Sequence, residues 1–165
     1  MKAYPPLISK ASGFTALFVG LLLSVLSPAF AASGAEVALP ENGDTHTLTK
    51  ADPIAPLQIV TSGEKAHYFV KLVSVNNKQT VQTIFVRSGE SVDTTVPLGS
   101  YRIKYAAGQD WLGEKLLFGD ETQFFEAEKQ FDFVRKGNQI SGFYLELILQ
   151  PGGNLSSRQI PKADW

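Results

Sequence analysis

Apolar side chains recur at every second position in the middle of the chain. This pattern runs through residues 67–75 and again through residues 101–105. The first series consists of Tyr68, Val70 and Leu72, and the second of Tyr101, Ile103 and Tyr105. Because successive side chains of a strand point to opposite faces, this period predicts strands with one buried and one solvated face.

Further β-type segments follow at roughly the 8–12-residue spacing of an all-β sandwich or barrel. Turn-forming pairs such as Asn76-Asn77, Ser88-Gly89 and Gly137-Asn138 separate them. We expect additional strands at 80–87, 90–97, 130–135 and 139–150, and shorter ones at 45–49, 115–118 and 156–160. The predicted fold class is all-β, a single antiparallel β-sandwich.

Three further features refine this prediction. Pro97 has no N–H to donate, so the strand 90–97 is expected to end there or to lie on a sheet edge. Residues 122–130 fit either one or two helical turns capped by Thr122 or an extended segment, and both interpretations remain open. The longest apolar stripe is expected in the strand 139–150, formed by Phe143, Leu145, Leu147 and Leu149.

The N-terminus carries a different pattern. Uncharged, mostly apolar residues fill positions 14–26, behind two lysines, and lead into the small-residue sequence Ala29-x-Ala31. This is the pattern of a secretory signal peptide. We therefore expect a cleaved signal helix at 1–31 and a periplasmic or secreted protein. An uncleaved membrane anchor is the alternative, although a spanning helix needs about 20 apolar residues.

Residues 32–56 are polar and are interrupted by Pro40, Pro53 and Pro56. They show no useful periodicity, so we interpret them as a flexible spacer. The folded domain is accordingly expected to be the β-sandwich 57–165.

Composition narrows the function classes. The chain has no cysteine, so it has no disulfides, cysteine metal sites or thiol nucleophiles. The absence of cysteine in a chain with a signal-peptide pattern also favours a bacterial protein. Eleven Phe, five Tyr and two Trp supply a core without such cross-links. Removing residues 1–31 leaves 13 basic and 16 acidic residues, a net charge of −3. No basic cluster is present in the sequence, so nucleic acid is not an expected partner, and membrane contact is expected only through an uncleaved signal.

Catalytic groups are sparse. His46 and His67 lie 21 residues apart and show no zinc-ligand spacing, and neither a Gly-x-Ser-x-Gly turn nor a phosphate loop occurs. Carboxylates gather at Asp120, Glu121, Glu126, Glu128 and Asp132. We interpret them as a solvated face, with a calcium site or a glycosidase-type pair as alternatives. We expect no cofactor, no metal and no catalytic residue, and the chain is not expected to be an enzyme.

The segment 109–125 is unusually aromatic for a connection that contains two glycines. One interpretation is a loop that closes an open end of the sandwich. The other is a partly exposed aromatic platform with a polar rim, as interface hot spots have. The candidate binding residues are Trp111, Lys115, Phe118, Asp120 and Thr122.

Two stretches of the sequence resemble known protein families. The stretch Gly89–Gly108, with its Pro-x-Gly-x-Tyr turn, resembles transthyretin-like and carboxypeptidase-regulatory-like β-sandwiches, which implies an immunoglobulin-like or transthyretin-like fold. The series Trp111-x-Gly113, Phe118-Gly119-x-x-Thr122 and Gly152-Gly153-Asn154-Leu155 resembles a bacterial secreted domain of no assigned role. That likeness covers about residues 66–165 and implies a stand-alone module.

The expected function is a non-enzymatic periplasmic or secreted module that binds another envelope or secreted protein. Addition of a strand at 90–96 or at the C-terminal tail is the expected mode. The alternative is a small-ligand or carbohydrate-binding protein, or a hydrolase of envelope polymers, that uses the loop 109–125.

Overall fold

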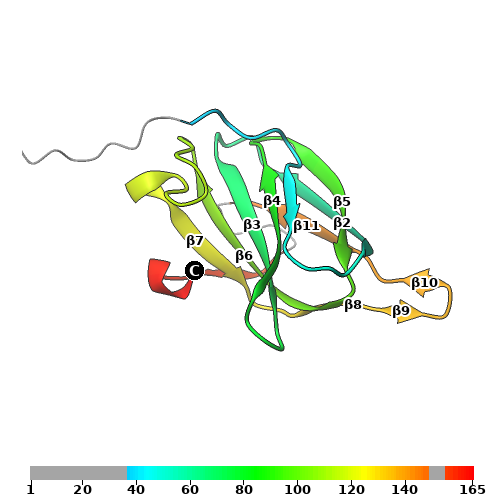
Figure 1. Cartoon of the computed structure of the whole chain (residues 1–165). Coiled ribbons are helices and arrows are strands. Elements are labelled where there is room, and N and C mark those ends of the chain that lie inside the picture. Colours follow the sequence, from blue (N-terminus) through cyan, green and yellow to red (C-terminus); the bar gives the residue numbers. More distant parts are fainter. Residues whose placement is uncertain (1–36, 149–154) are drawn as a thin grey trace, which may run out of the picture. The chain divides into compact units, whose positions relative to one another are not determined.

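The computed structural model describes residues 37–148 and 155–165. The expected signal peptide and Leu149 lie outside the described residues. Within them the chain is mostly β-structure and contains no α-helix, only the short 3-10 turns η1 (Gly119–Glu121) and η2 (Lys162–Asp164). The strands form sheets that do not close into a barrel (Figure 1).

The larger sheet has seven strands, all paired antiparallel. Its order is β1 (Thr45–Thr47), β4 (Thr80–Val86), β3 (His67–Ser74), β6 (Gly99–Gly108), β7 (Gln123–Ala127) and β12 (Ser157–Gln159), and β8 (Phe131–Phe133) pairs with the first residues of β6. The expected strands at 45–49, 67–75, 80–87, 130–135 and 156–160 are therefore confirmed.

The smaller sheet has the order β11 (Phe143–Leu147), β2 (Pro53–Thr61) and β5 (Ser91–Pro97). β5 ends at Pro97 and lies on the edge of this sheet, as expected from the missing N–H. β2 and β11 run parallel, so the expected antiparallel arrangement holds for every described pair except this one. A two-stranded hairpin, β9 (Arg135–Lys136) and β10 (Gln139–Ile140), extends away from both sheets (Figure 1).

Side chains from both sheets meet in one apolar core. It holds the predicted inward positions of three strands, Tyr68, Val70 and Leu72 of β3, Tyr101, Ile103 and Tyr105 of β6, and Leu145 and Leu147 of β11. Burial raises the pKa of the Tyr68 hydroxyl to about 12, because its charged form would lose hydration. The period of two in the sequence thus identified one face of the larger sheet correctly.

A second apolar cluster covers part of the opposite face of the larger sheet. Phe69 of β3, Phe85 of β4 and Phe124 of β7 belong to it, together with Trp111 and Phe118 from the connection between β6 and β7. Phe69 is 5% exposed, although its alternation with Tyr68 and Val70 predicted a solvated position. The larger sheet is therefore buried on both faces over this region.

The turn between β5 and β6 explains the Pro-x-Gly-x-Tyr sequence. Gly99 has φ +154, and a Cβ at this position would lie 2.7 Å from the Tyr101 hydroxyl oxygen. That hydroxyl contacts the carbonyl oxygens of Pro97 at 3.1 Å and Leu98 at 3.2 Å. Tyr101 thus packs back over the turn that Gly99 makes, as the sequence suggested.

The spacer prediction needs correction for the described residues. β1 lies within 32–56, and Ala55, at the start of β2, is fully buried. The side chain of Arg87 fixes the preceding segment by donating hydrogen bonds to the carbonyl oxygens of Pro40 at 2.8 Å and Leu39 at 3.3 Å. The domain therefore begins before residue 57. The sequence did not show this, because long-range hydrogen bonds hold an irregular, proline-containing segment that has no periodic pattern.

Three local predictions are also resolved. Residues 115–118 form turns rather than a strand, since the Gly113 carbonyl accepts hydrogen bonds from the N–H of Leu116 and of Leu117. Of the two structures left open for 122–130, the extended one is observed, as β7. The expected strand 139–150 is split at Ser141 and Gly142 into β10 and β11.

Candidate functional site

The aromatic rings of the loop 109–125 are buried against the larger sheet. Trp111 is 5% exposed and Phe118 is 3% exposed. The ring of Trp111 lies 4.9 Å from that of Phe85, nearly edge-on, and 5.4 Å from that of Phe118 (centroid distances). The rings therefore stabilise the fold from within, and they do not form the partly exposed platform that was one of the two interpretations of the sequence.

The polar candidates of this loop have separate surroundings. Lys115 and Asp120 are exposed. The Thr122 hydroxyl donates a hydrogen bond to the Gly119 carbonyl at 2.6 Å and accepts one from the Phe118 N–H at 3.1 Å. Thr122 thus closes the turn that positions Phe118. The structure brings Trp111 and Phe118 together, whereas a binding role for the five residues stays a prediction.

The two histidines have distinct surroundings. His67 accepts a hydrogen bond at Nδ1 from the Ser88 N–H at 3.1 Å, and its ring stacks on Phe85. Burial lowers the pKa of His67, and the nearby Arg87 guanidinium lowers it further. His46 is 55% exposed, with Nε2 at 3.4 Å from an Asp44 carboxylate oxygen. We interpret His67 as a neutral structural acceptor.

The acidic stretch does not form a shared site. Asp120, Glu121 and Glu128 are exposed. Glu126 pairs with Arg158 at 2.7 Å, and hydrogen bonds from Ser100 and Gln130 lower the pKa of Asp132. Within residues 37–148 and 155–165, no group of three or more histidine or carboxylate side chains is placed to hold a metal ion.

Two side chains, one from the larger sheet and one from the segment before β1, bond to the free edge of β5. In the antiparallel pair β2–β5, the backbone groups of Ser91, Asp93 and Thr95 point away from β2, because the alternate residues bond across the pair. The Asn42 amide donates to the Ser91 carbonyl at 2.9 Å, and the buried Gln82 amide donates to the Thr95 carbonyl at 3.0 Å. This edge is thereby tied to β4 and to the segment before β1.

The edge of β12 is different. Ile160 donates to the Phe124 carbonyl, and Ser156 accepts from Glu128, so residues 156, 158 and 160 bond to β7. By the antiparallel alternation, the N–H and C=O groups of Ser157 and Gln159 point away from β7. Among the described residues no strand pairs with this side of β12, which is the last strand of the sheet. Within the described part of the chain, β12 therefore presents an open edge.

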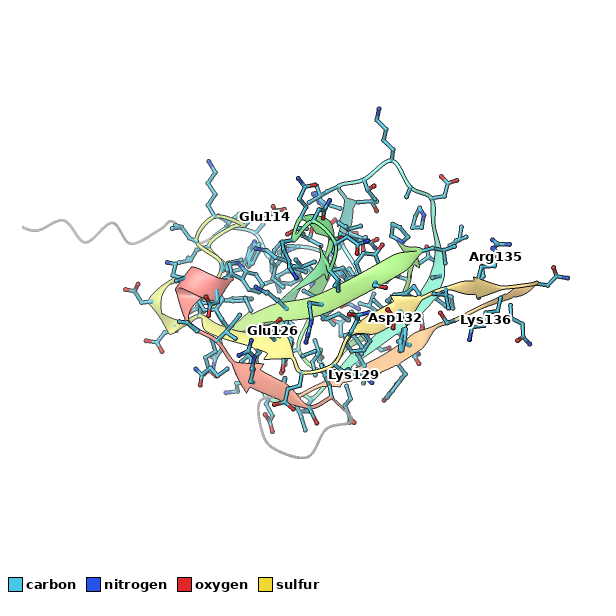
Figure 2. The ribbon with its side chains drawn as sticks, turned by 90° about the horizontal axis from the view of Figure 1, so that it is seen from below. Glu114, Glu126, Lys129, Asp132, Arg135 and Lys136 are labelled. Carbon is cyan, nitrogen blue, oxygen red and sulfur yellow. The ribbon has the colours of Figure 1, made fainter. Side chains whose placement is uncertain are left out.

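Next to β12 lies a basic groove on the outer face of the larger sheet. It has a volume of about 390 Å³, and its charged lining residues are Lys78, Arg102, Lys104, Glu126 and Arg158. Figure 2 shows Glu126 on β7, the strand that lies between β6 and β12. Sequence reasoning missed this site because its basic residues come from two strands and one turn that are distant in the sequence.

A wider, shallow hollow lies over the smaller sheet. Its volume is about 880 Å³, and Gln58, Asp93 and Tyr144 are among its lining residues. These three residues are aligned across β2, β5 and β11 by the strand register. Tyr144 is 49% exposed, so this sheet presents an aromatic ring beside an amide and a carboxylate.

No described helix has the length and apolar character needed to cross a membrane. Comparison of the chain with protein-family models, with characterised proteins and with solved structures gave no match.

Proposed function

We propose that this chain is an exported, non-enzymatic β-sandwich module, of the immunoglobulin-like or transthyretin-like class, that binds another periplasmic or secreted protein. The observation that carries the proposal is the open edge of β12. An unpaired strand edge offers backbone N–H and C=O groups to which an extended segment of a partner can bond, as in β-strand addition. The signal-peptide pattern of residues 1–31 supports export.

Strand addition at β12 uses four backbone groups. The N–H and C=O groups of Ser157 and Gln159 all point to the same side. Gln159 is exposed and Ser157 is half-buried, so an extended segment has access to this edge. The strand is only three residues long, and therefore side-chain contacts beside it must add to the affinity.

Of the two edges expected from the sequence, only the C-terminal one fits this mode. The β5 edge already has two of its outward carbonyls bonded to Asn42 and Gln82. Strand addition there requires breaking both bonds, one of them to a fully buried side chain. Natural proteins cover edges in this manner to prevent unwanted pairing, and the proposal is accordingly assigned to β12.

The substitution Gln159→Pro tests this mode. Proline removes the outward N–H of Gln159 and leaves the Ile160 N–H bond to Phe124 in place. We expect the unsubstituted protein to capture a partner from an envelope extract. The variant should keep the same melting temperature but should no longer capture this partner. The captured protein is identified by mass spectrometry, and the loss is then measured with the purified pair.

The matched control is Thr47→Pro on β1, at the other end of the same sheet. The N–H of Thr47 also points away from its neighbour strand, since Leu48 bonds to Val81 and Asp44 to Phe85. Thr47→Pro is expected to keep full capture. Equal capture by the two proline variants, or loss of capture in both, contradicts strand addition at β12.

A second candidate function, carbohydrate binding, is favoured by one observation. Tyr144 lies in register with Gln58 and Asp93 on the smaller sheet, and an aromatic ring beside polar side chains suits a sugar. This site replaces the loop 109–125 as its location, because Trp111 and Phe118 are buried. Absence of binding across a broad glycan array would remove this candidate.

A further inference from the structure

The basic side chains of the outer face are held mainly by neutral partners. Arg102 donates to the Glu128 carbonyl oxygen at 2.9 Å, and Lys104 donates to the Asp164 carbonyl oxygen. The ammonium of Lys71 lies 3.9 Å from the centre of the Trp165 ring. These contacts satisfy hydrogen-bonding groups but do not neutralise positive charge.

Two of these cations face each other directly. The register of β3 and β6 places Lys71 opposite Lys104, and like charges opposite each other destabilise a sheet. Burial lowers the pKa of Lys71, the charge of Lys104 lowers it further, and the charge of Glu114 opposes both effects. An anion bound nearby would offset this repulsion.

The carboxylate that lines the groove is already engaged. Glu126 is opposite Lys104 in the register of β6 and β7, but it pairs with Arg158, whose side chain is 64% exposed. Four basic side chains therefore share one lining carboxylate in a space of about 390 Å³. The whole chain has a net charge of −1, so this concentration of positive charge is a local feature.

We propose that this groove binds carboxylate side chains of an acidic, extended protein segment, the same segment that adds to β12. This proposal rests on the proposed function. A strand added to β12 lies about 4.8 Å from it, so its outer-face side chain is adjacent to Arg158. Arg102 and Lys104 lie on β6, with β12 and β7 between them and the added strand, so the segment must turn back over the outer face past the end of this short strand for its acidic residues to reach them. Charge complementarity identifies the partner segment as acidic.

The test uses a hexaglutamate peptide titrated into the full chain, with binding followed by chemical-shift changes. We expect binding that weakens about tenfold in the double variant Arg102→Gln/Lys104→Gln. It should also weaken when the ionic strength is raised, because salt screens such contacts. Lys78→Glu provides a second variant, since this side chain is exposed and lines the groove.

The matched control is Lys115→Gln/Lys136→Gln, which removes the same charge from exposed positions outside the groove (Figure 2 labels Lys136). The control variant should bind like the unsubstituted chain. Equal weakening in both double variants, or binding of inorganic phosphate without binding of hexaglutamate, overturns the proposal.

The variant Gln159→Pro separates the two proposals. Hexaglutamate reaches the groove without pairing to β12, so this variant should bind the peptide normally. If Gln159→Pro has no effect on partner capture while Arg102→Gln/Lys104→Gln loses the peptide, strand addition at β12 fails, and only the binding of carboxylates in the groove stands. If instead Gln159→Pro loses partner capture while Arg102→Gln/Lys104→Gln binds the peptide normally, strand addition at β12 is retained and the proposal for the groove is rejected.

Discussion

Replacement of Trp111 by alanine is expected to lower the free energy of unfolding by about 3–5 kcal/mol. The ring is 5% exposed and contacts Phe69, Phe85 and Phe118 at centroid distances of 4.9–5.5 Å. Its removal leaves a cavity over the outer face of β3 and β4, and the rigid strands below cannot close it. Chemical denaturation followed by circular dichroism measures the loss.

The control for this prediction is Leu116→Ala in the same loop. Leu116 is 51% exposed, so its truncation should change the free energy of unfolding by less than about 0.5 kcal/mol. If Trp111→Ala proved as mild as Leu116→Ala, the ring would belong to an exposed platform, as the sequence allowed. Such a result would reopen the loop 109–125 as a binding surface.

The substitution Gly108→Ala is expected to cost about 1–3 kcal/mol through overpacking. A Cβ at Gly108 would lie 2.3 Å from the Cβ and 2.4 Å from the Cγ of Phe118. These atoms are the base of the side chain, so Phe118 cannot move away by rotating its ring alone. The loop must shift with it, and the hydrogen bond of Thr122 to the Phe118 N–H is disturbed.

Gly63→Ala is the matched control for this second prediction. A Cβ at Gly63 meets no atom within 4 Å. Alanine there should leave stability unchanged or raise it slightly by restricting the unfolded chain. A thermal melt of both variants provides the comparison, and equal melting temperatures would show that the loop does not pack on the end of β6.

The strands were predictable from sequence because local alternation decides them. Tyr68, Val70 and Leu72 repeat with the period of a strand, and Asn76-Asn77 and Gly137-Asn138 mark turns. The same alternation predicted the solvated face incorrectly at Phe69. A side chain on that face is buried only because a distant loop covers it, and no local pattern contains this information.

Most of the candidate site, the open edge of β12 and the basic groove beside it, could not be predicted from the sequence. An open edge depends on which strands become neighbours, so the difference between β5 and β12 rests on Asn42 and Gln82, which are far from β5 in sequence. The groove likewise joins Lys78 to Arg158 across the sheet. The C-terminal tail was nevertheless recognised as an edge strand, because its polar, β-compatible composition is a local signal.

The exchange of four neighbouring amide protons tests the central claim, the open edge of β12, most directly. Hydrogen exchange followed by nuclear magnetic resonance resolves each of them in the free protein. The account predicts slow exchange for Arg158 and Ile160, which bond to β7, and fast exchange for Ser157 and Gln159, which point outward. Uniform protection of all four amides, or rapid exchange of all four, would contradict it.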